Sequence, residues 1–252
     1  MTTTFDCTLN GVSLSSLYGR ICVTDIVEDA PRMHETSLPL QSGGQRVLTR
    51  VRQSISVRVR FTLLEELPIA RRHVAGDILR WASQAGYLTI STRPGQRLHV
   101  TCTDMPGLSS QDWAQELTLT FTSTFAPWWE DAEATSAKGT DAVYLVVPGT
   151  AEEAPIDAVL LNTSAATINE VTVICGLSRM TFTGITLPPS GQLVLSHSKG
   201  HFIANVDGTS VLHCRTMDSS DDLLVPCGQT ATMYVTPSQS LYAFYNVRGR
   251  YL

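Results

Sequence analysis

Lysine is nearly absent from this chain of 252 residues. Of its 18 basic residues 16 are arginine, and 12 of the arginines precede residue 100. Arginine is favoured over lysine in fixed ion pairs and interfaces, but a GC-rich genome would also enrich arginine codons, and the sequence leaves both explanations open. The net charge of −5 gives no argument for a nucleic-acid-binding protein.

Targeting and membrane segments are also missing. The opening MTTTFDCTLN has neither the basic start nor the apolar run of a signal peptide, and no apolar stretch reaches the ~20 residues that cross a bilayer. We therefore expect a protein that is made and folded in a cytoplasm and does not meet a membrane. The cysteines form no CxxC pair, so we expect mostly buried free thiols at Cys7, Cys22, Cys102, Cys175, Cys214 and Cys227.

Motifs of catalytic chemistry are missing as well. There is no GxSxG elbow, and the SGGQ at 42–45 lacks the lysine of a phosphate loop. Adjacent carboxylates such as Glu65 and Glu66 point to opposite faces of a strand and do not converge on a substrate. We therefore expect no enzyme and no cofactor.

A pair of histidines in the second half suggests a metal site. His197 and His201 have a spacing that holds zinc on one helical face, and His213 and Cys214 follow. Gly200 interrupts the pair, and the surroundings have a strand–turn–strand pattern. We therefore expect ordinary histidines and no metal, and a hydrolase built on them is the third of three function hypotheses.

Strand patterns dominate what is present. Residues 54–64 alternate apolar and polar side chains, which indicates a half-buried antiparallel strand. Residues 116–125 do the same, with threonines on one face and, on the other, Leu117, Leu119, Phe121 and Phe125.

One helix is predicted over residues 68–86. Pro68 suits its start and Gly86 its end. Its apolar stripe consists of Val74, Ile78, Trp81, Ala82 and Ala85.

The whole chain is therefore predicted to be mainly β, with two domains. Residues 1–132 should form a β-barrel or sandwich-like domain with one packed helix. Residues 133–142 are small and polar and are expected to be a linker. In residues 143–252 short strands alternate with turns, which is typical of a β-sandwich or jelly roll.

Four arginines, Arg50, Arg52, Arg58 and Arg60, share one strand face. Nucleic acid is a poor partner for them, because the chain is acidic and lacks interleaved aromatics. The density of arginine exceeds what solubility needs. A solvated face and a contact with another subunit remain as alternatives.

The stretch LTLTFTSTFAPWWED, residues 117–131, runs from a strand into aromatic residues. We expect Pro127 to stop the strand and Trp128 and Trp129 to lie at a domain junction. Adjacent side chains point opposite ways, so one would pack under the first domain while the other meets the second domain or a neighbouring subunit. A sugar platform is the competing use of the pair.

Sugar binding by the second domain is the second function hypothesis, as a carbohydrate-binding host-adsorption module. That domain contains no tryptophan, because all four lie in the first half. Its aromatics are Tyr and Phe, many at positions expected to point inward, such as Phe244.

The order of these features resembles the distal tail protein (Dit) family of siphophages. The resemblance covers nearly the whole chain and depends on order and spacing, since no single motif is specific. The stretches that carry it are LNGVSL, VEDAPRMHETSLPLQSGGQRVLTRVRQSISVRVRFTL, ARRHVAGDILRWAS, YLTISTRPGQRLHVTCTDMP, LTLTFTSTFAPWWED, VTVICGLSRMTFTGITLPPSGQLVLSH, SSDDLLVPCGQTATMYV and RGRYL.

The resemblance implies a structural virion protein at the tail tip of a long non-contractile phage or prophage tail, made and assembled in the bacterial host cytoplasm. Its first domains would form a hexameric ring around the channel that DNA crosses as passing cargo, and a galectin-like second domain would project outward. The implied partners are its own copies, the tail tube protein, a tail-tip or tail-associated protein and a receptor-binding protein. The compact length and the lack of tryptophan in the second domain favour docking over direct receptor binding. In such a ring the arginine face would meet acids of the next subunit, such as Asp29, Glu35 or Glu130.

Overall fold

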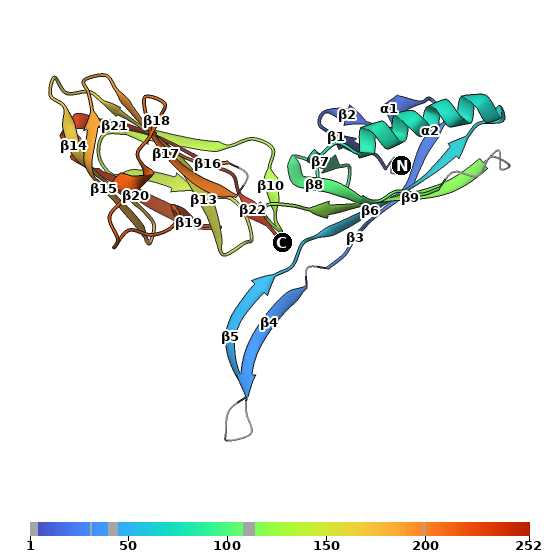
Figure 1. Ribbon diagram of the computed structural model, residues 1–252, viewed down its shortest axis with the longest axis horizontal. Coiled ribbons are helices and arrows are strands. Elements are labelled where there is room, and N and C mark those ends of the chain that lie inside the picture. The colour runs from blue at the N-terminus through green and yellow to red at the C-terminus, as the bar shows by residue number, and fades with distance from the viewer. Residues whose placement is uncertain (1–4, 31, 40–44, 108–113, 199) are drawn as a thin grey trace. The chain divides into compact units, whose positions relative to one another are not determined.

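The computed structural model describes residues 5–30, 32–39, 45–107, 114–198 and 200–252, and for 38–39 and 45–50 it describes the backbone alone. The chain divides into two compact units, Met1–Trp129 and Glu130–Leu252. Strands dominate both units (Figure 1), so the predicted mainly β class is confirmed.

The first unit contains one open antiparallel sheet in the order β2-β1-β7-β8-β9-β6-β3. Its described strands are β1 (Cys7–Leu9), β2 (Val12–Ser13), β3 (Ile21–Glu28), β6 (Ser56–Leu64), β7 (Gly86–Ile90), β8 (Gln96–Asp104) and β9 (Ala114–Ser123). A long helix lies on one face of this sheet (Figure 1), as expected for a β-rich first domain with one packed helix.

The alternating patterns of β6 and β9 face each other across the centre of this sheet. Val57, Val59 and Phe61 pair with Phe121, Leu119 and Leu117, and all six are buried. Burying such side chains stabilises the fold by about 1.5–3 kcal/mol each.

The helix α2 (Pro68–Ala82) covers this apolar face. Val74, Ile78, Trp81 and Ala82 are buried along one stripe, as predicted, whereas Ala85 lies beyond the helix and is exposed. The ring of Trp81 meets that of Phe121 edge-on, with 6.0 Å between centroids, a favourable aromatic geometry.

α2 ends earlier than the predicted 68–86, and Gly86 begins β7 instead. Gly86 lies against the side chain of Asn10, and an added Cβ would approach Asn10 Oδ1 to 1.9 Å. The glycine is therefore needed for close packing and does not end the helix. A short helix, α1 (Leu14–Leu17), was not predicted.

Glu65 fixes the start of α2. Its carboxylate accepts hydrogen bonds from the Tyr18 hydroxyl and from the Leu67 N–H at 2.9 Å. Its carbonyl accepts from Arg71 Nη2 at 2.6 Å. The Tyr18 hydrogen bond, followed by that of Leu67, lowers the pKa of Glu65 below its ordinary value.

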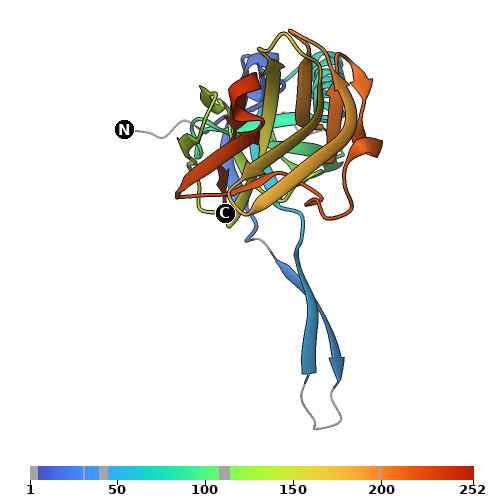
Figure 2. The same ribbon diagram turned by 90° about the vertical axis from the view of Figure 1, so that its left-hand side faces the viewer.

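A two-stranded arm interrupts the connection between β3 and β6. β4 (Met33–Pro39) and β5 (Gln45–Arg52) pair with each other in a sheet of their own. Figures 1 and 2 show them as a separate ribbon.

The second unit is a sandwich of two antiparallel sheets. One has the order β11-β21-β13-β16-β17-β18, with β19 added on β13, and the other has the order β12-β20-β14-β15. Their bounds are β11 (Thr135–Gly139), β12 (Val143–Val146), β13 (Glu153–Asn162), β14 (Ile168–Cys175), β15 (Ser178–Leu187), β16 (Gln192–Ser198), β17 (His201–Val206), β18 (Thr209–Ser210), β19 (Leu224–Pro226), β20 (Thr230–Thr236) and β21 (Leu241–Val247). The shorter elements are β10 (Trp129–Asp131), η1 (Leu212–Cys214), η2 (Ser238–Ser240) and β22 (Arg250–Tyr251).

The predicted linker, residues 133–142, contains a strand instead. β11 pairs with β21 from Thr135↔Val247 to Gly139↔Ala243. Backbone pairing requires no apolar pattern, so small polar residues can serve at the edge of a sheet.

A buried amide closes one end of the sandwich. Asn162 is 1% exposed, and its Nδ2 lies 2.8–3.0 Å from the carbonyl oxygens of Ala166, Leu187 and Pro188. Its Oδ1 accepts from the N–H and hydroxyl of Ser164. One polar side chain thereby joins segments 162–166 and 187–188, and its own buried groups are satisfied.

Candidate functional site

The arginine face of β6 carries two ion pairs within the chain. Arg58 Nη2 lies 2.7 Å from Asp29 Oδ1, and Arg60 Nη1 lies 3.6 Å from Asp25 Oδ2. The four side chains are 41–45% exposed, so each pair contributes at most about 1 kcal/mol.

Asp29, one of the acids expected to meet the arginine face from another subunit, is paired with Arg58 of its own chain, and the contact between subunits stays a prediction. β3 is the antiparallel neighbour of β6, and the register places Asp25 opposite Arg60 and Val27 opposite Arg58. Residues of one parity share a face, so Asp29 reaches the same side as Arg58. Glu130 likewise has a partner in its own chain, since Arg250 Nη2 lies 3.4 Å from its Oε1.

On the β9 side of β6 this face is lined by threonines. Thr118, Thr120 and Thr122 of β9 lie opposite Arg60, Arg58 and Ser56 of β6. Thr122 also shares a 3.0 Å hydrogen bond with Thr103. The side of the sheet away from α2 thus presents hydroxyls and paired charges, which suit a hydrated or polar contact.

Arg52, at the base of the arm, stacks on a tryptophan. Its guanidinium carbon lies 4.0 Å from the centroid of the Trp128 ring, a cation–π contact worth about 0.5–2 kcal/mol. The side chain of Arg50 lies outside the described part of the structure. Arg58 and Arg60 therefore belong to the face of the main sheet, whereas Arg52 belongs to the base of the arm.

The strand β9 ends at Ser123, four residues before the Pro127 that was expected to stop it. The Ser123 hydroxyl accepts the Ile55 N–H at 2.9 Å, and Thr124 donates its N–H to His99 O at 3.0 Å. These bonds replace further ladder pairing. Phe125, expected on the core face, is exposed instead and lies 4.7 Å from the His99 ring.

Trp129 is fully buried, and the first unit ends at this residue. The guanidinium carbon of Arg93 lies 5.3 Å from its ring, and Arg93 Nε lies 2.7 Å from Glu28 Oε2. Both adjacent tryptophans are therefore flanked by arginines of the first unit. Local sequence gave no sign of these contacts, because the arginines are far away along the chain.

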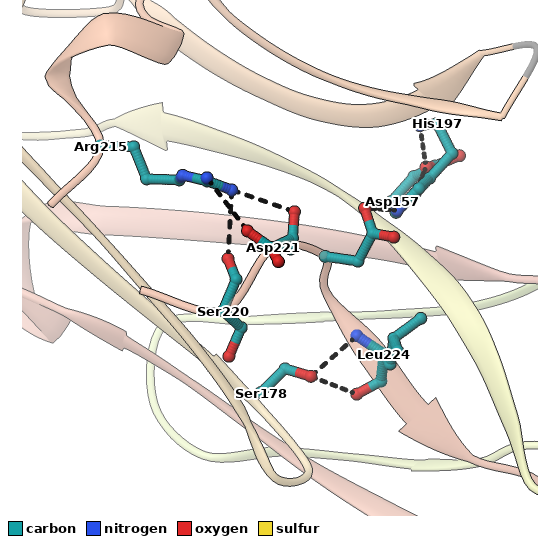
Figure 3. Close-up of polar contacts among 8 residues, drawn as sticks. Asp157, Ser178, His197, Arg215, Ser220, Asp221 and Leu224 are labelled. Atoms are coloured by element: carbon teal, nitrogen blue, oxygen red, sulfur yellow. Dashed lines mark hydrogen bonds and ion pairs between the residues drawn. The ribbon is translucent and has the colours of Figure 1, made fainter. Parts of the chain in front are cut away.

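His197 lies between two carboxylates in the second unit, and Figure 3 labels one of them, Asp157. Its Nδ1 lies 3.1 Å from Asp157 Oδ1, and its Nε2 lies 3.4 Å from Asp222 Oδ1. Because the two acids lie on opposite edges of the ring, they cannot share one metal ion with it. Among the described residues no group of His, Cys, Asp and Glu is arranged to hold a metal.

The cysteines are free thiols in different surroundings. Cys7, Cys175 and Cys227 are buried, whereas Cys22 is exposed, so the expectation of mostly buried thiols holds for only half of them. Burial raises the pKa of the Cys175 thiol to about 12, which leaves that thiol protonated and unreactive near neutral pH.

The aromatic side chains of β21 correct another prediction. Tyr245 is buried, whereas Phe244 is 40% exposed and therefore points outward. Phe244 and Tyr242 lie side by side on the outer face, with 4.9 Å between ring centroids. Lys138 lies opposite Phe244 on β11, so an aromatic pair with a polar neighbour is open to solvent here.

No described helix is long and apolar enough to span a membrane. No family model matches the chain, and no curated protein matches its sequence.

Solved structures do match. The SPP1 Dit protein, described as a paradigm of the hub adsorption apparatus in phages that infect Gram-positive bacteria, has a TM-score of 0.77 and 10% identity over 98% of this chain and 99% of its own. A chain of the phage P2 baseplate in its activated conformation with Ca has a TM-score of 0.55 and 8% identity over 99% of this chain and 98% of its own. A chain of the phage p2 baseplate in its activated conformation with Sr has a TM-score of 0.51 and 9% identity over 97% of each chain. The protein therefore has a Dit-like fold along its whole length.

Proposed function

We propose that this protein is a structural component of a phage tail, the distal tail hub of a long non-contractile tail. The observation that carries the proposal is the likeness to the SPP1 Dit protein, which covers 98% of this chain and 99% of that one. A likeness that includes both units favours a role using the whole chain over one that uses a single shared domain.

In this role the protein assembles as a hexameric ring that joins the tail tube to the tail-tip or baseplate and receptor-binding proteins. DNA passes through the ring as cargo, and the protein performs no catalysis. The ring is located at the tail tip of the virion.

Two features of the first unit support assembly into a ring. A ring requires one patch of a subunit to meet a different patch of its neighbour. The arm offers one such surface, because Met33 and Val51 are 42% and 58% exposed on a two-stranded sheet without a core of its own. The face of Arg58 and Arg60 offers the other, since its charges and hydroxyls can form polar contacts.

The mass of the purified protein in solution tests the proposal. Native mass spectrometry at tens of micromolar should give six times the 27.5 kDa of one chain, about 165 kDa, and micrographs should show rings. A strict monomer without rings would count against the proposed function as a tail hub.

Carbohydrate binding is the second candidate, and the exposed pair of Tyr242 and Phe244 favours it. Aromatic faces next to polar side chains are suited to sugar rings. Under this hypothesis the protein binds cell-wall glycans in a pull-down or glycan array, and Tyr242→Ala with Phe244→Ala abolishes the binding. Equal binding by this variant and the wild type would remove the pair from any sugar site.

A further inference from the structure

The strand β12 has an open edge. It lies at the end of the sheet β12-β20-β14-β15, and β20 is its one partner among the described strands, from Val143↔Met233 to Val146↔Thr230. Its four residues, VYLV, are all apolar or aromatic.

The direction of its backbone groups follows from the residue after it. Val147 donates its N–H to Gln229 O, on the β20 side. Backbone groups alternate in direction along a strand, so Val143 and Leu145 also bond toward β20. The N–H and C=O of Tyr144 and Val146 therefore point to the open edge.

The opposite side of β20 provides an independent check. The Gly176 N–H donates to Thr232 O at 3.1 Å, away from β12. Thr232 lies opposite Tyr144. Because the backbone groups of Thr232 point away from β12, Thr232 and Tyr144 form a pair without hydrogen bonds between the two strands. The two observations assign the same direction to the groups of Tyr144.

The same two residues expose their side chains. Tyr144 and Val146 are each 66% exposed, and Tyr234 on β20 is 45% exposed. Neither β12 nor β20 contains a charged residue. An apolar edge with free backbone groups is a surface to which another strand can pair, and proteins usually block such edges.

The other edge of this sheet is blocked. Thr216 and Ser220 donate their N–H groups to the carbonyls of Thr181 and Arg179, at 2.9 and 2.7 Å. The hydroxyls of Ser219 and Ser220 accept the N–H groups of Thr181 and Arg179. Segment 215–221 is itself held by hydrogen bonds between Arg215 and the Ser220 and Asp221 carbonyls (Figure 3).

The second sheet of the unit ends in strands that resist pairing. β18 has two residues, and β11 is the polar sequence TSAKG, which includes Lys138. Short strands and lysine are common means of blocking an edge. Among the described edges of this unit, β12 is the one that combines an apolar sequence with outward backbone groups.

We propose that β12 binds an extended segment of another protein, which adds a fifth strand to the sheet. The backbone groups of Tyr144 and Val146 would pair with it, which is recognition by strand addition. The absence of charge on β12 and β20 fits an uncharged segment with apolar residues at alternate positions. This inference goes beyond the hub role and rests on the second unit alone, so loss of ring assembly would not refute it.

The probe for this proposal is the blocked peptide TATMYVT, the sequence that already pairs with β12 from the other side. Amide hydrogen exchange across residues 143–147 of the full chain is followed by mass spectrometry. The peptide should slow the exchange of the outward N–H groups of Tyr144 and Val146 at least about tenfold, as two new hydrogen bonds form.

Val146→Pro removes one outward N–H that bonds to none of the described residues, and should weaken peptide binding about tenfold or more. Tyr144→Lys places a charge at the same edge, and gives a second variant if the proline disturbs folding. The matched control is Tyr234→Ser, which removes an exposed aromatic from the same face but leaves the edge intact, and should change binding less than about threefold.

Three results would overturn the proposal. The first is exchange at 143–147 that the peptide does not slow. The second is a larger loss of binding for Tyr234→Ser than for Val146→Pro, which would indicate a contact on the face of the sheet. The third is protection that grows with protein concentration without peptide, which would identify a second copy of β12 as the occupant.

Discussion

Reversing the charges of Arg58 and Arg60 tests whether their face forms the ring contact. The double variant Arg58→Glu, Arg60→Glu changes the net charge from −5 to −9, since each substitution changes it by −2. It also places new carboxylates beside Asp29 and Asp25, which are the present partners of the two arginines. We expect a folded monomer that no longer assembles.

The expected loss of stability is modest because these groups are 41–45% exposed. Losing two exposed ion pairs and gaining repulsion of similar size costs about 1–3 kcal/mol in total. Typical domains unfold with about 5–15 kcal/mol, so the fold should survive. If the arginines are buried in a ring contact, removing a charged partner costs about 2–5 kcal/mol at each interface, which weakens each contact about 30- to 5,000-fold.

The measurement is mass in solution by native mass spectrometry, with thermal unfolding to verify the fold. A matched control is Arg72→Glu with Arg80→Glu, which makes the same change in net charge on the exposed side of α2. This control should assemble like the wild type. Rings of unchanged mass from the Arg58 and Arg60 variant would refute the assignment, and loss of rings in both variants would attribute assembly to net charge instead.

Three further predictions concern single side chains. Trp128→Ala removes the ring on which Arg52 stacks, so proteolysis should cut the arm faster while the unfolding free energy falls by only about 1–2 kcal/mol. An unchanged cleavage rate would show that the Arg52–Trp128 contact does not hold the arm. Asn162→Ala leaves buried carbonyls without their donor, so denaturant unfolding should show a loss of about 2–4 kcal/mol, and a change below about 0.5 kcal/mol would mean that water replaces the amide. The pKa of Glu65 is lowered by the Tyr18 hydrogen bond. The contribution of this carboxylate to stability is therefore complete above its ordinary pKa of 4.5 and is lost as pH falls through the lower folded value. Glu65→Gln should flatten the dependence of unfolding free energy on pH in this window, and identical curves for the two proteins would exclude the Glu65 carboxylate as the cause of that dependence.

Local patterns predicted the elements whose burial follows sequence spacing. The alternation in residues 54–64 and 116–121 matches the buried residues of β6 and β9. The helical stripe of Val74, Ile78 and Trp81 matches the buried face of α2. In each case a period of two or about 3.6 residues determines which side chains can face a core.

Where local patterns failed, a partner distant in sequence decided the outcome. Residues 135–139 form a strand because they pair with β21, which is distant in sequence. Phe244 faces outward because the neighbouring Tyr245 occupies the core. Neither result can be obtained from composition, since each depends on which strands become neighbours.

The sequence by itself therefore determined the mainly β class, the single long helix and the face on which Arg58 and Arg60 lie. The tertiary structure alone decided that their acids come from the same chain, Asp25 in β3 and Asp29 directly after β3. It alone placed Arg52 on Trp128 and left the edge of β12 open. The physical reason is that side-chain period is a local property of the backbone, whereas ion pairs, ring stacking and free edges depend on contacts between distant segments.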